Sequence, residues 1–367
     1  MLKAADADIL RWAGTQPWAE PMRRCQQDAQ WHAEGDVWTH TGMVFDQATQ
    51  VEGYAELDRV EQVCLLFTAL LHDAGKPATT CLDPETGRTR SPRHSLVGAA
   101  MARQVLRDLS CDLSTREHIV NLVRYHGRPP YLLEASRDPE REVIGLSCLL
   151  SNRLLYLFAL ADTRGRHTIS TTRAEDVLHL WRDTALEHDC FVKSYAFAND
   201  LARFLFHRGG LSSLHFTPHE NYRCTVTMMS GLPGAGKDTW LARQRPGLPM
   251  VSLDALRDEF NVSATDNQGQ VIQAARERCR QHLRASQDFA FNATNLTASL
   301  RKRWIDLFAD YQARIEITYL EPPVSTILRQ NHDRPDPVPE SVIRNLIDKM
   351  EVPTLAEAHE VVFCGEA

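Results

Sequence analysis

Long apolar runs are absent from this sequence of 367 residues. No stretch reaches about 18 consecutive apolar residues, the length that a membrane-spanning helix needs. Residues 1–14, MLKAADADILRWAG, include acidic residues and lack the apolar core of a signal peptide. We therefore expect a cytoplasmic protein that does not span a membrane.

Paired cysteines are absent as well. The nine cysteines are spread singly from Cys25 to Cys364, and no two of them form a CxxC pair. An odd, dispersed set of this kind is typical of buried, reduced thiols and excludes a disulfide framework or a zinc ribbon.

The sequence also has no excess of positive charge. It contains 41 Lys and Arg residues against 48 Asp and Glu residues, which gives a net charge of −7. Bulk charge therefore gives no support for nucleic-acid binding, and any such function must be argued from local sites. Only six of the basic residues are lysines, a bias that a GC-rich genome produces by itself.

Two kinds of pattern divide the chain. Residues 1–207 read as helices, because segments such as 57–73 and 145–166 carry apolar residues three and four positions apart. Residues 208–222 are rich in Gly, Ser and Pro and predict a linker. Beyond it, a helix is expected over 269–287, and β-rich runs occur at 224–230, 249–254, 289–295, 314–321 and 359–364. Alternating strands and helices predict a parallel sheet, so we expect a multidomain protein with an all-α domain followed by an α/β domain at 223–367.

A glycine-rich loop follows the first of these strands and opens a helix. It reads GLPGAGKDT and comprises Gly231, Gly234, Ala235, Gly236, Lys237, Asp238 and Thr239. This spacing and context predict a P-loop, in which backbone N–H groups bind the phosphates of ATP and the lysine reaches the β- and γ-phosphates. Asp238 stands where a Ser or Thr normally holds Mg²⁺. We expect its carboxylate to bind Mg²⁺ directly or through water, and Thr239 could assist; the alternative is that Asp238 caps the helix.

Two further elements accompany the P-loop. Asp254 and Arg257 follow the second strand, at the carboxyl edge that lines the ligand crevice of such sheets. Asp254 is placed to accept a proton from a hydroxyl and Arg257 to hold a phosphate, although an N-cap aspartate beside a solvated arginine is an alternative. Downstream, Arg329 and Arg334 flank a segment typical of lids that close over a transferring phosphoryl group, although a surface loop with solvated arginines is an alternative, especially for Arg329.

These motifs resemble the polynucleotide 5′-kinase branch of the P-loop phosphotransferases. The resemblance covers most of residues 224–367, through GLPGAGKDT, SLDALR and RQNHDRPDPVPESVIRNL. It implies that Asp254 is the general base for a 5′-OH, that Arg257 binds the neighbouring nucleic-acid phosphate, and that Arg334 contacts ATP. D-x-x-R distinguishes polynucleotide acceptors from small molecules only moderately well.

The helical half holds a set of potential metal ligands in the order H…HD…H…H…D. Its members are His40, His72, Asp73, His94, His126 and Asp162. Imidazole and carboxylate together suit a hydrolytic divalent metal such as Mn²⁺, Ni²⁺, Fe²⁺ or Zn²⁺. A metal there would generate hydroxide and neutralise phosphate charge.

The sequence segments around these ligands resemble the HD phosphohydrolase superfamily, and especially the HD domain of bacterial tRNA nucleotidyltransferases. They are EGDVWTHTGMV, ALLHDAGKP, SPRHSLVGA, VRYHGRPP and LADTRGR, within residues 28–170. The resemblance implies a core metal site of His40, His72, Asp73 and Asp162, with His94 and His126 holding a second metal unless they are structural histidines. Lys76, Arg164 and Arg166 flank these ligands and suit substrate phosphate, although the two arginines are also ordinary cations at a helix C-terminus.

Together, the two halves resemble the bacterial HD–polynucleotide kinase end-healing enzymes. This implies a role in RNA repair: the HD domain removes 2′,3′-cyclic and 2′/3′-phosphate ends of RNA or DNA, and the kinase domain transfers the γ-phosphate of a nucleotide triphosphate to 5′-OH ends. A ligase would then act downstream. Two alternatives stay open, an HD nucleotidase fused to a small-molecule or nucleoside kinase, and a sensor in which ATP regulates the HD module.

Overall fold

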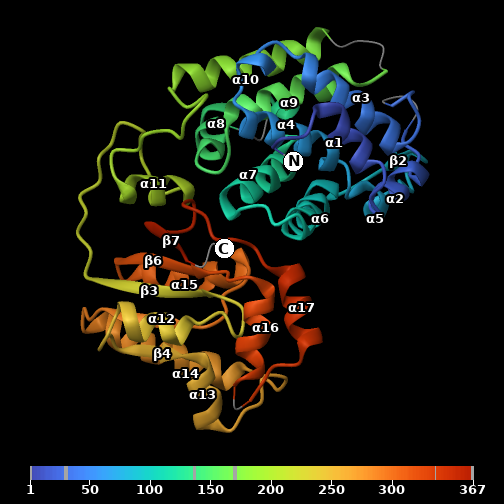
Figure 1. Cartoon of the computed structure of the whole chain (residues 1–367). Helices are drawn as coiled ribbons and strands as arrows, with labels where there is room; N and C mark the ends of the chain where they lie inside the picture. Colours follow the sequence, from blue (N-terminus) through green and yellow to red (C-terminus); the bar gives the residue numbers. More distant parts are fainter. Residues whose placement is uncertain (1, 29–31, 135–137, 168–171, 335, 365–367) are drawn as a thin grey trace. The chain divides into compact units, whose positions relative to one another are not determined.

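A computed structural model describes residues 2–28, 32–134, 138–167, 172–334 and 336–364 (Figure 1). The chain divides into two compact units, Met1–Ala196 and Phe197–Ala367. Helix α11 (Asp200–His207) falls in the second unit, where Phe204 belongs to the main core. The sequence instead predicts that this helix belongs to the first domain, which would end at residue 207. The predicted ranges of the two functional domains, 1–207 and 223–367, remain a prediction.

The first unit is helical. Its elements in order are α1 (Asp6–Ala13), α2 (Ala19–Arg24), α3 (Val37–Gln50), η1 (Tyr54–Glu56), α4 (Arg59–Leu71), α5 (Lys76–Thr79), β1 (Cys81–Leu82), β2 (Thr89–Arg90), α6 (His94–Asp108), α7 (Leu113–Tyr125), η2 (Pro129–Tyr131), α8 (Pro139–Ser147), α9 (Asn152–Arg164) and α10 (Thr172–Glu187). The short antiparallel pair β1–β2 is a small addition to the helical architecture that the sequence predicts.

Helix α4 lies at the centre of this unit, and local signals fix where it begins. Asp58 accepts a hydrogen bond from the backbone of Glu61, whose side chain bonds back to the Asp58 backbone, so a capping box starts the helix. Every residue from Val63 to Leu71 is buried, because α3, α7 and α9 all pack against it. His72 and Asp73 come directly after the helix and are therefore buried as well.

Residues 145–166, which the apolar spacing predicts as helical, form parts of two helices with a sharp bend. Helices α8 and α9 meet at 114°. Ser151 accepts a hydrogen bond from the Leu154 backbone and starts α9 anew. No single helix among the described residues is long and apolar enough to cross a membrane; only this bent pair passes by length and composition together.

The second unit is a five-stranded parallel sheet with covering helices. After α11, its elements are β3 (Cys224–Gly231), α12 (Lys237–Gln244), β4 (Met250–Ser252), α13 (Leu253–Phe260), α14 (Gly269–Arg284), β5 (Phe289–Asn292), α15 (Ala298–Asp310), β6 (Ala313–Leu320), α16 (Val324–His332), α17 (Glu340–Lys349) and β7 (Glu360–Cys364). The strand order is β4-β5-β3-β6-β7, and all neighbouring strands run parallel. This confirms the α/β fold predicted from alternating strands and helices.

Periodic apolar positions attach the helices to the sheet. Helix α14 buries Val271, Ala275, Cys279 and Leu283, each four residues after the last, so one narrow stripe faces the core. The central strand β3 carries the P-loop at its carboxyl end and pairs with β5 and β6. Side chains that follow β3, β4 and β5 therefore meet at one edge of the sheet.

Candidate functional site

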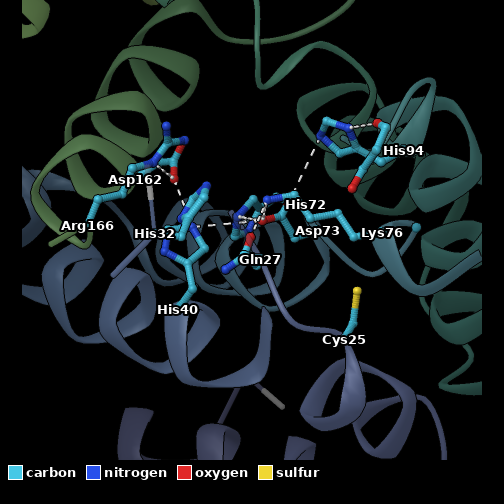
Figure 2. A network of polar contacts seen from close by, with 12 residues as sticks. Cys25, Gln27, His32, His40, His72, Asp73, Lys76, His94, Asp162 and Arg166 are labelled. Carbon is cyan, nitrogen blue, oxygen red and sulfur yellow. Dashed lines mark hydrogen bonds and ion pairs between the residues drawn. The ribbon is translucent and has the colours of Figure 1, made fainter. Parts of the chain in front are cut away.

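The ligands predicted in the helical unit converge in one buried cluster (Figure 2). His40, His72 and Asp162 have ligand atoms within 4.8 Å of one another, and so do Asp73, His94 and His126. They come from α3, the residues after α4, the start of α6, the end of α7 and the last turn of α9. Thus all six residues that the sequence singles out lie together.

Backbone carbonyls orient three of the histidines. The Nδ1 atoms of His72, His94 and His126 lie 2.9, 2.8 and 2.8 Å from the carbonyl oxygens of Ala69, Ser91 and Val123. A carbonyl can only accept, so each Nδ1 carries a proton, and in the neutral form of each ring the lone pair lies on Nε2. The Nε2 atoms of His94 and His126 lie 3.2 Å apart, so one cation could bind both nitrogens.

Asp73 lies between the two groups of ligands. Its Oδ2 is 3.1 Å from His72 Nε2 and 3.8 Å from His40 Nε2, whereas its Oδ1 is 3.5 Å from His94 Nε2. One carboxylate therefore presents a different oxygen to each group. This arrangement is compatible with a carboxylate that two metal ions share.

Gly75 lets helix α6 approach close enough to bring His94 to the cluster. A Cβ atom at this position would lie 2.2 Å from the His94 carbonyl oxygen and 2.6 Å from the Gly98 nitrogen. Both are backbone atoms that cannot move aside, so only glycine fits at this position, which follows the His72–Asp73 pair after Ala74.

The pKa shifts at His94, His126 and Asp73 favour the forms that bind metals, whereas at His40 the hydrogen bonds to Asp162 and Glu34 outweigh burial and raise the pKa. Burial lowers the pKa of His94, and burial together with the charges of His72 and His94 lowers the pKa of His126 to about 3. Burial alone would raise the pKa of Asp73, but the charges of His72 and Lys76 outweigh it and hold that pKa well below its usual range. Neutral imidazoles beside ionised carboxylates are the forms that bind metals.

Two residues that sequence reasoning missed extend the cluster behind His40. Glu34 Oε1 is 2.9 Å from His40 Nδ1 and 2.8 Å from His32 Nδ1, while His40 Nε2 lies 3.1 Å from Asp162 Oδ1. A carboxylate on Nδ1 fixes the ring so that Nε2 faces the cluster, as in carboxylate–histidine–metal arrangements. The sequence signal for Glu34 is an acidic residue a few positions before His40.

Of the cations near the cluster, Lys76 and Arg166 contact it directly. Lys76 Nζ is 2.7 Å from Asp73 Oδ2, and Arg166 forms an ion pair with Asp162. Arg164 instead pairs with Glu175 of α10, its Nη2 lying 2.9 Å from Oε2. Of the two arginines that the sequence left undecided, the structure thus brings Arg166, and not Arg164, to the predicted ligands.

These residues fit a divalent metal. His72 Nε2 is buried and makes no hydrogen bond within the described residues, although Asp73 lies beside it. Such an orphaned nitrogen, three further inward-facing Nε2 atoms and two ionised carboxylates form a donor set for a hydrolytic metal. HD domains bind divalent metals, and the donor set does not select one metal among Mn²⁺, Ni²⁺, Fe²⁺ and Zn²⁺.

The second unit holds a separate cavity of about 1380 Å³ at the carboxyl edge of its sheet. The P-loop residues from Gly234 to Thr239 line it, together with Asp254, Arg257, Asn292 and Arg334. Gly234, with φ of +79°, passes so close to α16 that a Cβ atom would lie 2.7 Å from the Ile327 carbonyl. Gly231 closes the strand side of the loop and is buried.

Lys237 is held across its own loop. Its Nζ donates to the carbonyl oxygens of Gly231 at 3.0 Å and Leu232 at 2.9 Å. Burial lowers the pKa of Lys237 to about 8, while Asp254 and Asp238 act in the opposite direction. The incoming phosphates of a nucleotide would favour its charged form.

Asp254 and Arg257 form an ion pair in the wall of this cavity. Asp254 lies in the first turn of α13 rather than at the end of β4, because Ser252 caps that helix early. Arg257 Nε also donates to Gln268 Oε1 at 2.8 Å, and Gln268 in turn holds the carbonyls of Ser263 and Asp266. Gln268, which the sequence did not suggest, therefore fixes the guanidinium against Asp254.

The segment between α16 and α17 contributes one of its two predicted arginines. Arg334 lines the cavity, whereas Arg329 is exposed and does not line it. Pro335, also part of the predicted lid, lies outside the described residues.

Two family models match the chain. One is described as an HD domain and matches residues 37–153; the other is described as an AAA domain and matches residues 226–353. The chain thus consists of a helical HD domain followed by a P-loop kinase-like α/β domain. A P-loop kinase fold implies ATP and Mg²⁺.

Curated relatives are similar over part of this chain. The Multifunctional CCA protein of Halorhodospira halophila is 31% identical over 167 residues, 43% of this chain and 37% of the relative. The CC-adding tRNA nucleotidyltransferase of Thermus thermophilus is 47% identical over 60 residues, 16% of this chain and 14% of the relative. This chain therefore spans 37% or less of the length of these relatives.

Among solved structures, a sugar kinase from Janibacter sp. is 17% identical and covers 39% of this chain and 85% of its own, with a TM-score of 0.31. A TM-score this low carries no information about function.

Proposed function

We propose that this chain is a bifunctional enzyme that heals the ends of RNA or DNA. Its HD domain hydrolyses 2′,3′-cyclic phosphate and 2′/3′-phosphate ends, and its kinase domain transfers the γ-phosphate of ATP to 5′-OH ends. Both products are those that a ligase needs, so a ligase would act downstream in the cytoplasm.

The observation that carries the phosphoesterase proposal is the position of Asp73 between two groups of histidine ligands. Its two oxygens face His72 on one side and His94 on the other, at 3.1 and 3.5 Å. When bound, divalent metals would supply a hydroxide and neutralise phosphate charge. Lys76 and Arg166, already in contact with the two carboxylates, would bind the phosphate oxygens of the substrate.

For the kinase, the support is that one cavity combines Lys237, Asp254 and Arg257. We infer that Lys237 and the loop amides bind the ATP phosphates, with Arg334 over them. Asp254 accepts the proton of the 5′-OH as the oxygen attacks the γ-phosphorus. ADP then leaves, and the proton stays on Asp254 until the product departs.

The Asp254–Arg257 ion pair suggests why the acceptor would be a polynucleotide. A carboxylate paired to a guanidinium is a poor base, because the positive charge stabilises its ionised form. A phosphate next to the 5′-terminal nucleoside would compete for Arg257 and leave Asp254 free to take the proton. Nucleosides lack that phosphate and would be poor acceptors. The names of the curated relatives, one a CCA protein and the other a CC-adding tRNA nucleotidyltransferase, favour nucleic acid over small molecules for the HD domain as well.

A pair of substrates tests the proposal against a nucleotidase fused to a nucleoside kinase. Oligonucleotides with a 5′-OH and a 2′,3′-cyclic phosphate are compared with the matching nucleoside and nucleoside 2′,3′-cyclic phosphate, at several concentrations of each metal. We expect kcat/KM to be far higher for the oligonucleotides. Equal or higher values for the mononucleosides would overturn the proposal in favour of the alternative.

A further inference from the structure

A buried amide faces the P-loop aspartate at the carboxyl end of β5. Asn292 is the last residue of β5 and is 5% exposed. Its Nδ2 donates to Asp238 Oδ1 at 2.6 Å, and its Oδ1 is buried without a hydrogen-bond partner among the described residues. A buried amide oxygen that loses water without gaining a donor is unfavourable, so Asn292 Oδ1 has an unused acceptor position that a cation or a metal-bound water would fill.

The pair exchanges the residue types that P-loop enzymes normally use. In those enzymes a loop Ser or Thr and a strand-end Asp hold Mg²⁺. Here the loop carries the carboxylate of Asp238, and the strand end carries the amide of Asn292. Either arrangement places one carboxylate and one neutral oxygen at the site, so the charge offered to the cation is the same.

The local structure argues against a capping role for Asp238. The residue before α12 is Gly236, and the helix start has no side-chain cap. Asp238 is exposed to the cavity, except for its hydrogen bond to Asn292. The Asp238 carboxylate therefore lies at the nucleotide cavity, and the buried amide of Asn292 orients it.

We propose that Asp238 and Asn292 form the Mg²⁺ site of the kinase domain as an exchanged pair. Asp238 supplies the negative charge, and Asn292 orients it and offers an uncharged oxygen to the cation or its water. This inference rests on the proposed function only in that the domain binds ATP with Mg²⁺; it does not depend on the acceptor.

Four proteins test the exchange: wild type, Asp238→Thr, Asn292→Asp and the double variant that carries both changes. The affinity for a fluorescent ATP analogue is measured across a Mg²⁺ titration without any acceptor, and Mn²⁺ binding is followed by electron paramagnetic resonance. Asp238→Thr leaves no carboxylate in the pair, so we expect the Mg²⁺-dependent gain in affinity to fall about 10–100-fold. The double variant has the usual Thr and Asp and should regain most of that loss.

Asn292→Asp alone places two carboxylates where a 2.6 Å hydrogen bond now lies. We expect it to bind ATP more weakly than wild type when Mg²⁺ is scarce, because the carboxylates repel each other and the phosphates. Asp258→Ser, which removes another carboxylate from the cavity wall, is the matched control and should not change the Mg²⁺ dependence.

A double variant no better than Asp238→Thr would overturn the inference, as would an unchanged Mg²⁺ dependence in Asp238→Thr. Thermal unfolding of each variant identifies a folding defect, and in that case Asp238→Ser with Asn292→Asp repeats the test. Wild-type protein that binds Mg²⁺ and ATP in the expected way but phosphorylates no 5′-OH end would contradict the proposed function and leave this inference standing.

Discussion

Replacing Asp73 by Asn should eliminate the phosphoesterase and spare the kinase. The carboxylate is buried, with Oδ2 3.1 Å from His72 Nε2 and 2.7 Å from Lys76 Nζ. Asparagine keeps the size and removes the charge. A metal that generates hydroxide and neutralises phosphate contributes several kcal/mol to the transition state, so its loss should lower the rate by about 10³-fold or more.

The same change should also destabilise the HD domain. Lys76 would keep Gln27 Oε1, 2.6 Å from its Nζ, but lose its nearest negative charge in a site where its side chain is 13% exposed. We expect a cost of about 1–3 kcal/mol in the free energy of unfolding. Adding Lys76→Met should recover stability without recovering activity, which separates the two effects.

Three assays check this prediction: metal content by mass spectrometry, release of terminal phosphate, and 5′-phosphorylation on the same protein preparation. Asp46→Asn, an exposed aspartate of α3, is the matched control and should behave as wild type. Asp73→Asn that retains both metal and phosphoesterase activity would refute the assignment of Asp73. Loss of the kinase in a folded variant would refute the assignment of the two activities to separate sites.

Further changes probe the rest of the account. Glu34→Gln should weaken metal affinity about 10–100-fold, measured by competition with a chelator, because it removes the carboxylate on His40 Nδ1; unchanged affinity would remove Glu34 from the site. Asp254→Asn should lower kcat about 10²–10⁴-fold while leaving ATP affinity nearly intact, and a loss confined to ATP binding would contradict its role as a base. Arg257→Gln should raise KM for a 5′-OH oligonucleotide far more than for a nucleoside; equal effects on both would argue against phosphate recognition. Burial lowers the pKa of His359 to about 4, below its ordinary 6.5. Below pH 6.5 the unfolded chain therefore binds a proton that the folded second unit does not, and about 3 kcal/mol of the free energy of unfolding should be lost as pH falls toward 4. Urea unfolding across this pH range should show that slope in wild type and in His332→Gln, a mostly exposed control, but not in His359→Gln; a parallel slope in all three would contradict it.

Periodicity and motif spacing predict most of the architecture, since the signals involved are local. Apolar residues three and four apart indicate α4, and short β-rich runs indicate β3, β5 and β6. The break between α8 and α9 depends on one serine that caps a new helix, which a continuous apolar pattern conceals. Helix α11 follows the helical pattern of the first half, yet Phe204 packs in the core of the second unit, and only tertiary contacts reveal that.

At the sites, the sequence identifies residues whose chemistry is unusual for their surroundings and misses those that act through a neighbour. An HD pair after a buried helix and a lysine after a glycine loop are visible as motifs. Glu34, Gln268 and Asn292 are not, because each matters through a distance to another side chain. Asn292 could nonetheless have been predicted in the same way as Asp254, because a polar residue at the carboxyl end of a parallel strand faces the ligand crevice.

The central claim is that one chain carries both end-healing activities. The direct test incubates the full-length protein with an RNA that has a 5′-OH and a 2′,3′-cyclic phosphate, together with ATP and a panel of divalent metals, and identifies both termini by mass spectrometry. We predict a product with a 5′-phosphate and a free 2′,3′-diol. Asp73→Asn should form the 5′-phosphate but not the diol, and Asp254→Asn should form the diol but not the 5′-phosphate. An RNA unchanged at both ends, under conditions in which mononucleosides are phosphorylated or dephosphorylated, would contradict the claim.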